Sequence, residues 1–147
     1  MSSRPAHCVI DANVILRGLL LDSKELSGMA MGILKAVEEG RVAVCCDPVT
    51  LAEVVWVLWR CYSRSRQDIA SALEPIVRAE CFHMTEKDRY LRALELYGTT
   101  VEHFGDACVC AAALEECEGR LYSFDRKLSS VPGVKRAEHV GADTGQD

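Results

Sequence analysis

The stretch that decides the fold is residues 7–20, which read HCVIDANVILRGLL. Residues 7–10 form a short apolar run that favours a β-strand, and this run stops at Asp11. Residues 13–20 then have the pattern of a helix. The stretch therefore predicts a strand-to-helix junction with an aspartate at the point where the chain turns.

The same alternation of strand and helix continues along the chain. The sequence predicts helices over residues 24–39, 48–61, 67–78 and 86–97, a buried strand over 41–46 and a short strand over 81–84. In the first of these helices, which Ser23 can cap and Gly40 can end, six apolar side chains recur at helical spacing: Leu26, Met29, Ala30, Ile33, Leu34 and Val37. These side chains share one face of the predicted helix, which would form a helical hairpin with the helix before it.

A second junction lies near the end of the chain. Gly105 and Asp106 start a helix of small residues that is apolar on all sides for two turns and is expected to be buried. Residues 121–124 then favour a strand that ends at Asp125. Alternating strands and helices indicate an α/β domain on a mainly parallel sheet, where ligand sites collect beyond the carboxyl ends of the strands. We expect Asp11 and Asp125 at that edge.

Length and composition bound the domain organisation. With 147 residues, 49% of them hydrophobic, the chain fits one domain, which we place at residues 1–137, followed by a polar and flexible tail over 138–147. No apolar run approaches the roughly 20 residues of a membrane-spanning helix. The apolar stretch within the first 13 residues is broken by Asp11 and is too short for the hydrophobic region of a secretory signal. We therefore expect a cytoplasmic protein with no membrane partner.

The eight cysteines do not form a recognisable metal or redox motif. No CxxC pair occurs, and the close neighbours are Cys45-Cys46 and Cys108-x-Cys110. Because the cysteines lie within apolar segments, we expect reduced thiols that act as small buried hydrophobes.

The net charge of −5 argues against nucleic-acid binding through a broad basic surface. Two local basic groups partly offset this: Arg60, Arg64 and Arg66 in one segment, and Arg126, Lys127, Lys135 and Arg136 in another. Each group is equally compatible with an ordinary solvated surface.

Four carboxylates stand out as candidates for chemistry. Asp11, Asp106 and Asp125 are at or near helix starts, where an aspartate can simply cap free N–H groups. Glu53 lies in the apolar segment LAEVVWVLW, so its carboxylate is expected to enter or border a buried region. Such a charge needs a cation, a raised pKa or a basic partner, for which Arg17 and Arg60 are alternatives to a metal.

An oxygen-only donor set favours Mg²⁺ or Mn²⁺ over zinc. Carboxylates around such an ion suit phosphodiester hydrolysis, because the metal activates water and stabilises charge in the transition state. The four histidines are scattered through the sequence, and none lies in a nucleophile motif.

Four segments resemble the motifs of PIN-domain ribonucleases in order and spacing. These are VIDANVIL at residues 9–16, PVTLAEVV at 48–55, FGDA at 104–107 and LYSFDRKL at 121–128. The resemblance is closest to the VapC-like toxins of toxin–antitoxin modules and extends to about Val134. Any one motif is weak, whereas four in order are fairly specific.

The resemblance implies a site, a fold and partners. Asp11, Glu53, Asp106 and Asp125 would hold the divalent metal and orient the attacking water. Asn13 and Ser123 would hydrogen-bond the metal ligands, and three basic side chains could meet substrate phosphates: Arg17, Arg126 and Lys127. The implied fold is a three-layer α/β/α sandwich. The implied partners are RNA as substrate, a second copy in a homodimer and a small antitoxin.

Three alternatives to a ribonuclease are a silent binding domain, a phosphatase and a receiver domain. One alternative is a catalytically silent PIN-fold domain that binds RNA or protein, although all four acidic positions are filled. A haloacid-dehalogenase-like phosphatase would need an aspartate where this chain has Asn13, and a downstream lysine motif is lacking. A receiver domain with Asp11 as phosphate acceptor fits poorly, because that aspartate follows a central strand and not the first one.

Overall fold

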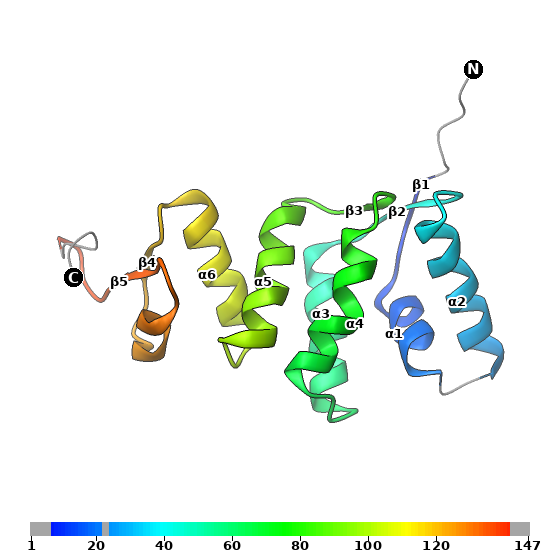
Figure 1. Cartoon of the computed structure of the whole chain (residues 1–147), viewed down its shortest axis with the longest axis horizontal. Helices are drawn as coiled ribbons and strands as arrows, with labels where there is room; N and C mark the ends of the chain where they lie inside the picture. Colours follow the sequence, from blue (N-terminus) through cyan, green and yellow to red (C-terminus); the bar gives the residue numbers. More distant parts are fainter. Residues whose placement is uncertain (1–6, 22–23, 142–147) are drawn as a thin grey trace, which may run out of the picture. The chain divides into compact units, whose positions relative to one another are not determined.

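The computed structural model describes residues 7–21 and 24–141 (Figure 1). The predicted cap Ser23 and residues 142–147 of the predicted tail lie outside the described residues. The chain forms two compact units, one up to Lys87 and one from Asp88 onward. We refer to them as unit 1 and unit 2.

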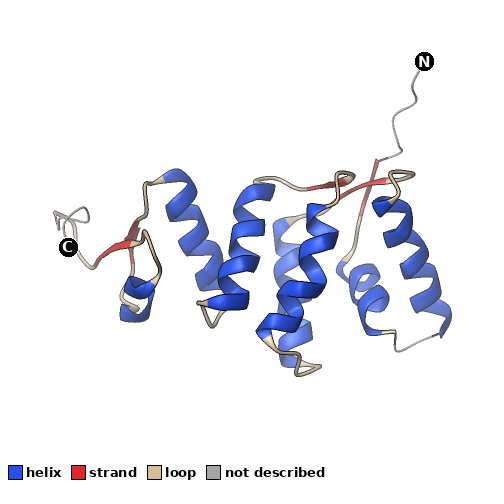
Figure 2. Cartoon of the chain, viewed as in Figure 1, coloured by secondary structure: helices blue, strands red, loops and turns tan. Residues whose placement is uncertain are grey.

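Unit 1 is built of short strands alternating with helices (Figures 1 and 2). Its described elements, in chain order, are β1 (His7–Val9), α1 (Ala12–Leu20), α2 (Lys24–Glu38), β2 (Ala43–Cys45), α3 (Pro48–Arg60), α4 (Arg66–Arg78) and β3 (Phe82–His83). Each predicted element of this part of the chain is present, with ends that differ by a few residues. Gly40 has a φ of 75°, a conformation that favours glycine, so it ends α2 as expected.

The three strands of unit 1 form a parallel sheet in the order β1-β2-β3. β1 pairs with β2 through Val9 and Cys45, and Ile10 N–H donates to the Cys45 carbonyl at 3.0 Å. β2 pairs with β3 through Val44 and Phe82. The predicted α/β class and the parallel pairing are confirmed.

The core of unit 1 lies between this sheet and its helices. Val44 and Phe82 are almost completely buried. The buried stripe of α3 contributes Leu51, Val54, Val55 and Leu58. At about 25 cal/mol per Å² of apolar surface removed from water, fully burying a side chain of this size contributes about 1.5–3 kcal/mol, which is why this stripe fixes the orientation of α3.

The apolar face of α2 is only partly buried. Ala30, Leu34 and Val37 are buried, but Met29 and Ile33 are exposed, as is Leu26. The buried residues pack toward α1, where a Cβ on Gly18 would lie 2.5 Å from Leu34 Cδ1. The apolar stripe is wider than the surface that α1 covers, so its outer part reaches solvent.

Unit 2 contains two helices, two short strands and a 3₁₀ helix among its described residues. In chain order these are α5 (Lys87–Thr99), α6 (Phe104–Glu116), β4 (Arg120–Tyr122), η1 (Arg126–Ser130) and β5 (Lys135–Ala137). An ion pair joins Arg92 of α5 to Glu115 of α6 at 3.0 Å. The rings of Tyr97 and Phe104 meet edge to face, with centroids 5.6 Å apart.

β4 and β5 form a parallel pair in which Leu121 lies opposite Arg136. The sequence did not predict β5, whose residues are mainly charged. Gly119 makes the pairing possible, because its φ is 85° and a Cβ there would collide with the Gly133 carbonyl. β5 ends at Ala137, the last residue of the expected domain.

The cysteines only partly follow the prediction. All eight are free thiols, as expected, and Cys46 and Cys110 are buried. The expected burial is wrong for Cys8, Cys61 and Cys117, which are exposed. Their apolar sequence neighbourhoods lie at the edge strand β1 and just beyond the ends of α3 and α6, where packing stops.

None of the helices among the described residues has the length and apolar character of a membrane-spanning segment.

Candidate metal centre and active site

The four candidate carboxylates are divided between the two units. Asp11 and Glu53 belong to unit 1, and Asp106 and Asp125 belong to unit 2. Within the described parts of the chain, no three His, Cys, Asp or Glu side chains are grouped as a metal site.

Asp11 is placed by the end of β1 and the start of α1. Its backbone is extended, with φ −89° and ψ 150°, and its Oδ1 accepts a hydrogen bond from Asn13 N–H at 3.1 Å. Asp11 therefore caps α1, while its side chain remains exposed at the carboxyl edge of the sheet. Asn13 is also exposed, and it serves Asp11 here through its backbone N–H.

A further aspartate, Asp47, lies at the same edge of the sheet. It follows β2 by the same two residues that separate Asp11 from β1, and the register pairs Val9 with Cys45. Asp47 Oδ1 accepts from Val49 N–H at 2.8 Å and so caps α3. Asp47 was not among the residues predicted from the sequence. The signal that was available is an aspartate directly before Pro48, a common helix start.

Glu53 lies in the second turn of α3, and its side chain is exposed. The prediction that it enters or borders a buried region is wrong. The reason is that α3 buries only one stripe of its apolar surface, and Glu53 lies outside that stripe next to the exposed Trp56. Its carboxylate is therefore accessible to a cation or a substrate without a burial penalty.

In unit 2, Asp106 and Asp125 line one hollow of about 310 Å³. Asp106 is half-buried in the first turn of α6, where a negative charge is favoured by the helix dipole. Asp125 follows β4 and caps η1, because its Oδ1 accepts from Lys127 N–H at 3.0 Å. The hollow is at the lower end of the size range of ligand pockets. The structure thus brings together two of the four carboxylates in one accessible space.

Both carboxylates also act on one buried thiol. The pKa of Cys110 is raised mainly by burial, and further by the negative charges of Asp106 and Asp125. The two carboxylates of the hollow therefore both face the part of α6 that contains Cys110.

Lys127 supplies a positive charge to the same hollow. Its Nζ lies 3.9 Å from Glu102 Oε2, and both side chains are largely exposed. A surface pair of this kind contributes at most about 1 kcal/mol, so Lys127 can exchange Glu102 for a phosphate at little cost. Arg126 is also exposed, while Arg17 is half-buried in α1.

The segment that carries Asp125 is held by Ser123 and Arg136. Ser123 Oγ accepts from Asp125 N–H at 3.0 Å. Arg136 donates from Nη1 to the Ser123 carbonyl at 2.8 Å and from Nε to Ser129 Oγ at 2.8 Å. Its side chain is only 15% exposed and also pairs with Glu138. The sequence placed Arg136 in a basic group, whereas here it ties β4 to η1.

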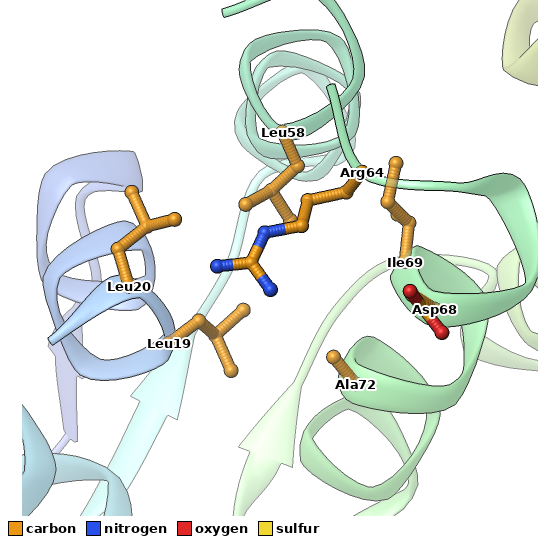
Figure 3. Close-up of a pocket in the computed structure, with 7 residues that line it drawn as sticks. All are labelled: Leu19, Leu20, Leu58, Arg64, Asp68, Ile69 and Ala72. Carbon is orange, nitrogen blue, oxygen red and sulfur yellow. The ribbon is translucent and has the colours of Figure 1, made fainter. Parts of the chain in front are cut away.

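Each unit also has a hollow that none of the four candidate carboxylates lines. One, in unit 2, has a volume of about 290 Å³ and a largely apolar wall, with the exposed rings of Tyr122 and Phe124 on either side of Ser123. The other, in unit 1, measures only about 70 Å³, and Figure 3 shows the Arg64 guanidinium reaching between Leu20 and Leu58. The second hollow is far smaller than a nucleotide site requires.

The donor chemistry of the larger hollow fits Mg²⁺. This ion is commonly bound by one or two carboxylates, with waters and substrate phosphates completing its coordination. Asp106 and Asp125 supply two such carboxylates at an accessible position.

The comparison with family models gives a single result. The PIN domain model matches residues 8–134, which is most of the chain, so this chain belongs to the PIN domain family. Its fold is therefore of the nuclease type, and PIN domains generally use divalent metals and bind RNA. A search of the curated proteins finds no match.

Proposed function

We propose that this chain is a Mg²⁺- or Mn²⁺-dependent endoribonuclease that hydrolyses phosphodiester bonds in RNA. The observation that carries the proposal is the hollow of unit 2, where Asp106, Asp125 and Lys127 converge in a PIN-domain chain. The two carboxylates can hold a metal ion, and the Lys127 ammonium supplies a second positive charge. A phosphate in this hollow could therefore be bound by both.

The residues of the hollow take distinct roles in this proposal. Asp106 and Asp125 would hold the divalent cation, which when bound activates water and offsets charge on the phosphate. Lys127 would leave Glu102 and pair with a non-bridging phosphate oxygen. A carboxylate oxygen would orient the attacking water and accept its proton as the water oxygen bonds to phosphorus; one P–O bond of the diester breaks and the leaving oxygen takes up a proton, which gives a phosphate monoester and a free hydroxyl. Ser123 and Arg136 would keep Asp125 in place through the hydrogen bonds described above.

We propose that Asp11 and Glu53 complete the acidic site. Support comes from their positions in the first two PIN-like motifs and from their exposure: neither carboxylate is hidden in the core of unit 1. Asn13 would orient Asp11, and the basic side chains Arg17 and Arg126 would contact flanking phosphates.

RNA would also be recognised by stacking. Tyr122 is 66% exposed and Phe124, which directly precedes Asp125 in the chain, is 84% exposed. Aromatic faces of this kind stack on unpaired bases at about 1–3 kcal/mol per base. This mode of binding does not need a broad basic surface, so it is compatible with the net charge of −5.

We further propose that the protein acts in the cytoplasm as a VapC-like toxin, as a homodimer restrained by a small antitoxin. The support is the resemblance of the four motifs to that class. The test is growth arrest on induced expression, which Asp106→Asn should abolish. Co-expression of the product of an adjacent small gene should relieve the arrest.

The experiment that tests the activity is incubation of purified full-length protein with total cellular RNA and Mg²⁺ or Mn²⁺. Wild-type protein should give discrete fragments that disappear with a chelator and with Asp106→Asn or Asp125→Asn. The matched control is Asp88→Asn, because Asp88 is also an acid in the first turn of a helix but does not line the hollow. RNA binding without cleavage by the wild type would replace the proposal with a silent binding domain.

A further inference from the structure

The outer face of α2 contains two glycines that the fold of the chain does not require. A Cβ built on Gly28 or Gly32 would meet nothing within 4 Å, in contrast to Gly18, where the helix α1 packs closely on Leu34. Glycine weakens the interior of a helix relative to alanine. Glycines at positions i and i+4 of one helix face are useful where another backbone must approach closely.

Exposed apolar side chains border these glycines. Met29 is 60% exposed and Met31 is 49% exposed, one on each side of the glycine row. Since α2 already buries Ala30, Leu34 and Val37 toward the core, its two faces are both apolar in their central turns. Contiguous apolar surface on a soluble chain indicates a surface that a partner covers.

The order of residues on this face is symmetric. Residues 25–35 read ELSGMAMGILK, so that Gly28 and Gly32, Met29 and Met31, and Glu25 and Lys35 are each equidistant from Ala30. At 100° per residue, Glu25, Gly28, Gly32 and Lys35 all project away from the buried side of α2. The two charges at the ends of this face are of opposite sign.

Such an arrangement is complementary to itself. In a two-fold contact, residue i of one copy meets residue j of the other, and j meets i. Antiparallel α2 helices whose outer faces cross between Gly28 and Gly32, at the level of the buried Ala30, would set Gly28 against Gly32 of the partner subunit, with the methionines packed alongside. Glu25 would face Lys35 of the partner subunit at both ends.

We propose that the outer face of α2 is a self-association surface that pairs antiparallel with α2 of a second copy about a two-fold axis midway between Gly28 and Gly32. This names a surface for the homodimer proposed above and does not depend on nuclease activity. A helix of 15 residues is about 22 Å long at 1.5 Å per residue, and one helix pair covers less than the ~800 Å² per partner of a typical stable interface. Dimerisation through α2 alone should therefore depend on protein concentration.

The first test is a charge exchange followed by sedimentation velocity of the full chain. Glu25→Lys or Lys35→Glu alone places like charges opposite each other and should weaken dimerisation at least fivefold. An equimolar mixture of the two variants should form a heterodimer, and the double variant should regain the wild-type dissociation constant. Asp88→Lys is the control, because it removes a first-turn acid from α5 and should leave association unchanged.

The second test is Gly28→Gln with Gly32→Gln, which fills the close-approach row with good helix formers that meet nothing in the chain itself. This variant should be monomeric at concentrations where the wild type is dimeric, with a melting temperature at or above that of the monomeric wild type. A wild type that stays monomeric at about 100 μM would overturn the proposal. Dimerisation unaffected by the glycine and charge variants would do the same and would show that another surface mediates it.

Discussion

Replacement of Arg136 by alanine should loosen the segment that carries Asp125. The structure gives Arg136 three hydrogen-bonded partners: the Ser123 carbonyl at 2.8 Å, Ser129 Oγ at 2.8 Å and Glu138 Oε1 at 2.7 Å. A hydrogen bond from a charged donor contributes about 1.5–3 kcal/mol when it is part-buried, as the bond to the Ser123 carbonyl is, whereas the bonds to the exposed Ser129 and Glu138 together add about 1 kcal/mol. We therefore expect Arg136→Ala to lower the free energy of unfolding by about 2–4 kcal/mol.

The assay is urea unfolding of the full chain followed by far-ultraviolet circular dichroism, together with RNA cleavage under native conditions. Arg136→Lys keeps the charge but loses the planar fork, so its loss of stability should be intermediate. Activity should fall more than the unfolded fraction explains, because Asp125 is no longer held in place. The matched control is Arg120→Ala, which removes only an exposed pair with Glu118. Equal effects of Arg136→Ala and Arg120→Ala on stability and activity would show that Arg136 does not hold Asp125 in place.

Three further results are expected. Burial, with the nearby Asp47 charge, raises the pKa of Cys46 to about 11. The thiol of the unfolded chain ionises at about 9, so between pH 9 and 11 the unfolded state loses a proton that the folded state keeps, and the free energy of unfolding should fall by about 2–3 kcal/mol over that range. Cys46→Ser should flatten that part of the curve of unfolding free energy against pH. Glu53→Gln should change the melting temperature by less than about 2 °C because the side chain is exposed, yet reduce RNA cleavage at least tenfold; cleavage at the wild-type rate would remove Glu53 from the site. Gly28→Ala with Gly32→Ala should stabilise the monomer by about 1–2 kcal/mol in thermal unfolding, and a destabilised monomer would show that the glycines serve the chain's own packing.

The elements of the fold were largely predictable because local signals agreed with one another. The junction at Asp11 combines an apolar strand, a capping aspartate and a helical pattern, and the structure contains all three. The end of α2 at Gly40 follows from the same kind of local chemistry. β5 was missed because Lys135 and Arg136 do not show the alternation of a half-buried strand. Its pairing depends on Gly119, whose contact with Gly133 is not local in sequence.

Burial was harder to predict than secondary structure. The apolar face of α2 and the surroundings of Glu53 look buried in sequence because periodicity counts apolar residues without showing how much surface the neighbouring elements cover. The result is that Met29 and Ile33 are exposed, and so is Glu53. The same argument applies to Cys8, which lies in an apolar strand at the edge of the sheet.

The candidate site was predictable only as a set of residues. Their order along the chain predicted Asp106 and Asp125 for one site, and the structure places these two in the same hollow. The roles of all four carboxylates in metal binding and catalysis remain predictions. Arg136 could not be recognised as a support for Asp125, because its hydrogen bonds join residues 7 and 13 positions away in the sequence.

Whether the hollow of unit 2 holds a divalent metal is tested most directly by Mn²⁺ binding to the full chain, measured by electron paramagnetic resonance with the metal as its own probe. Wild-type protein should bind Mn²⁺ in competition with Mg²⁺, and Asp106→Asn and Asp125→Asn should each weaken binding at least tenfold, while Asp88→Asn should bind like the wild type. Binding that is unchanged in both Asp106→Asn and Asp125→Asn would contradict the account, because the hollow of unit 2 would then not hold the metal.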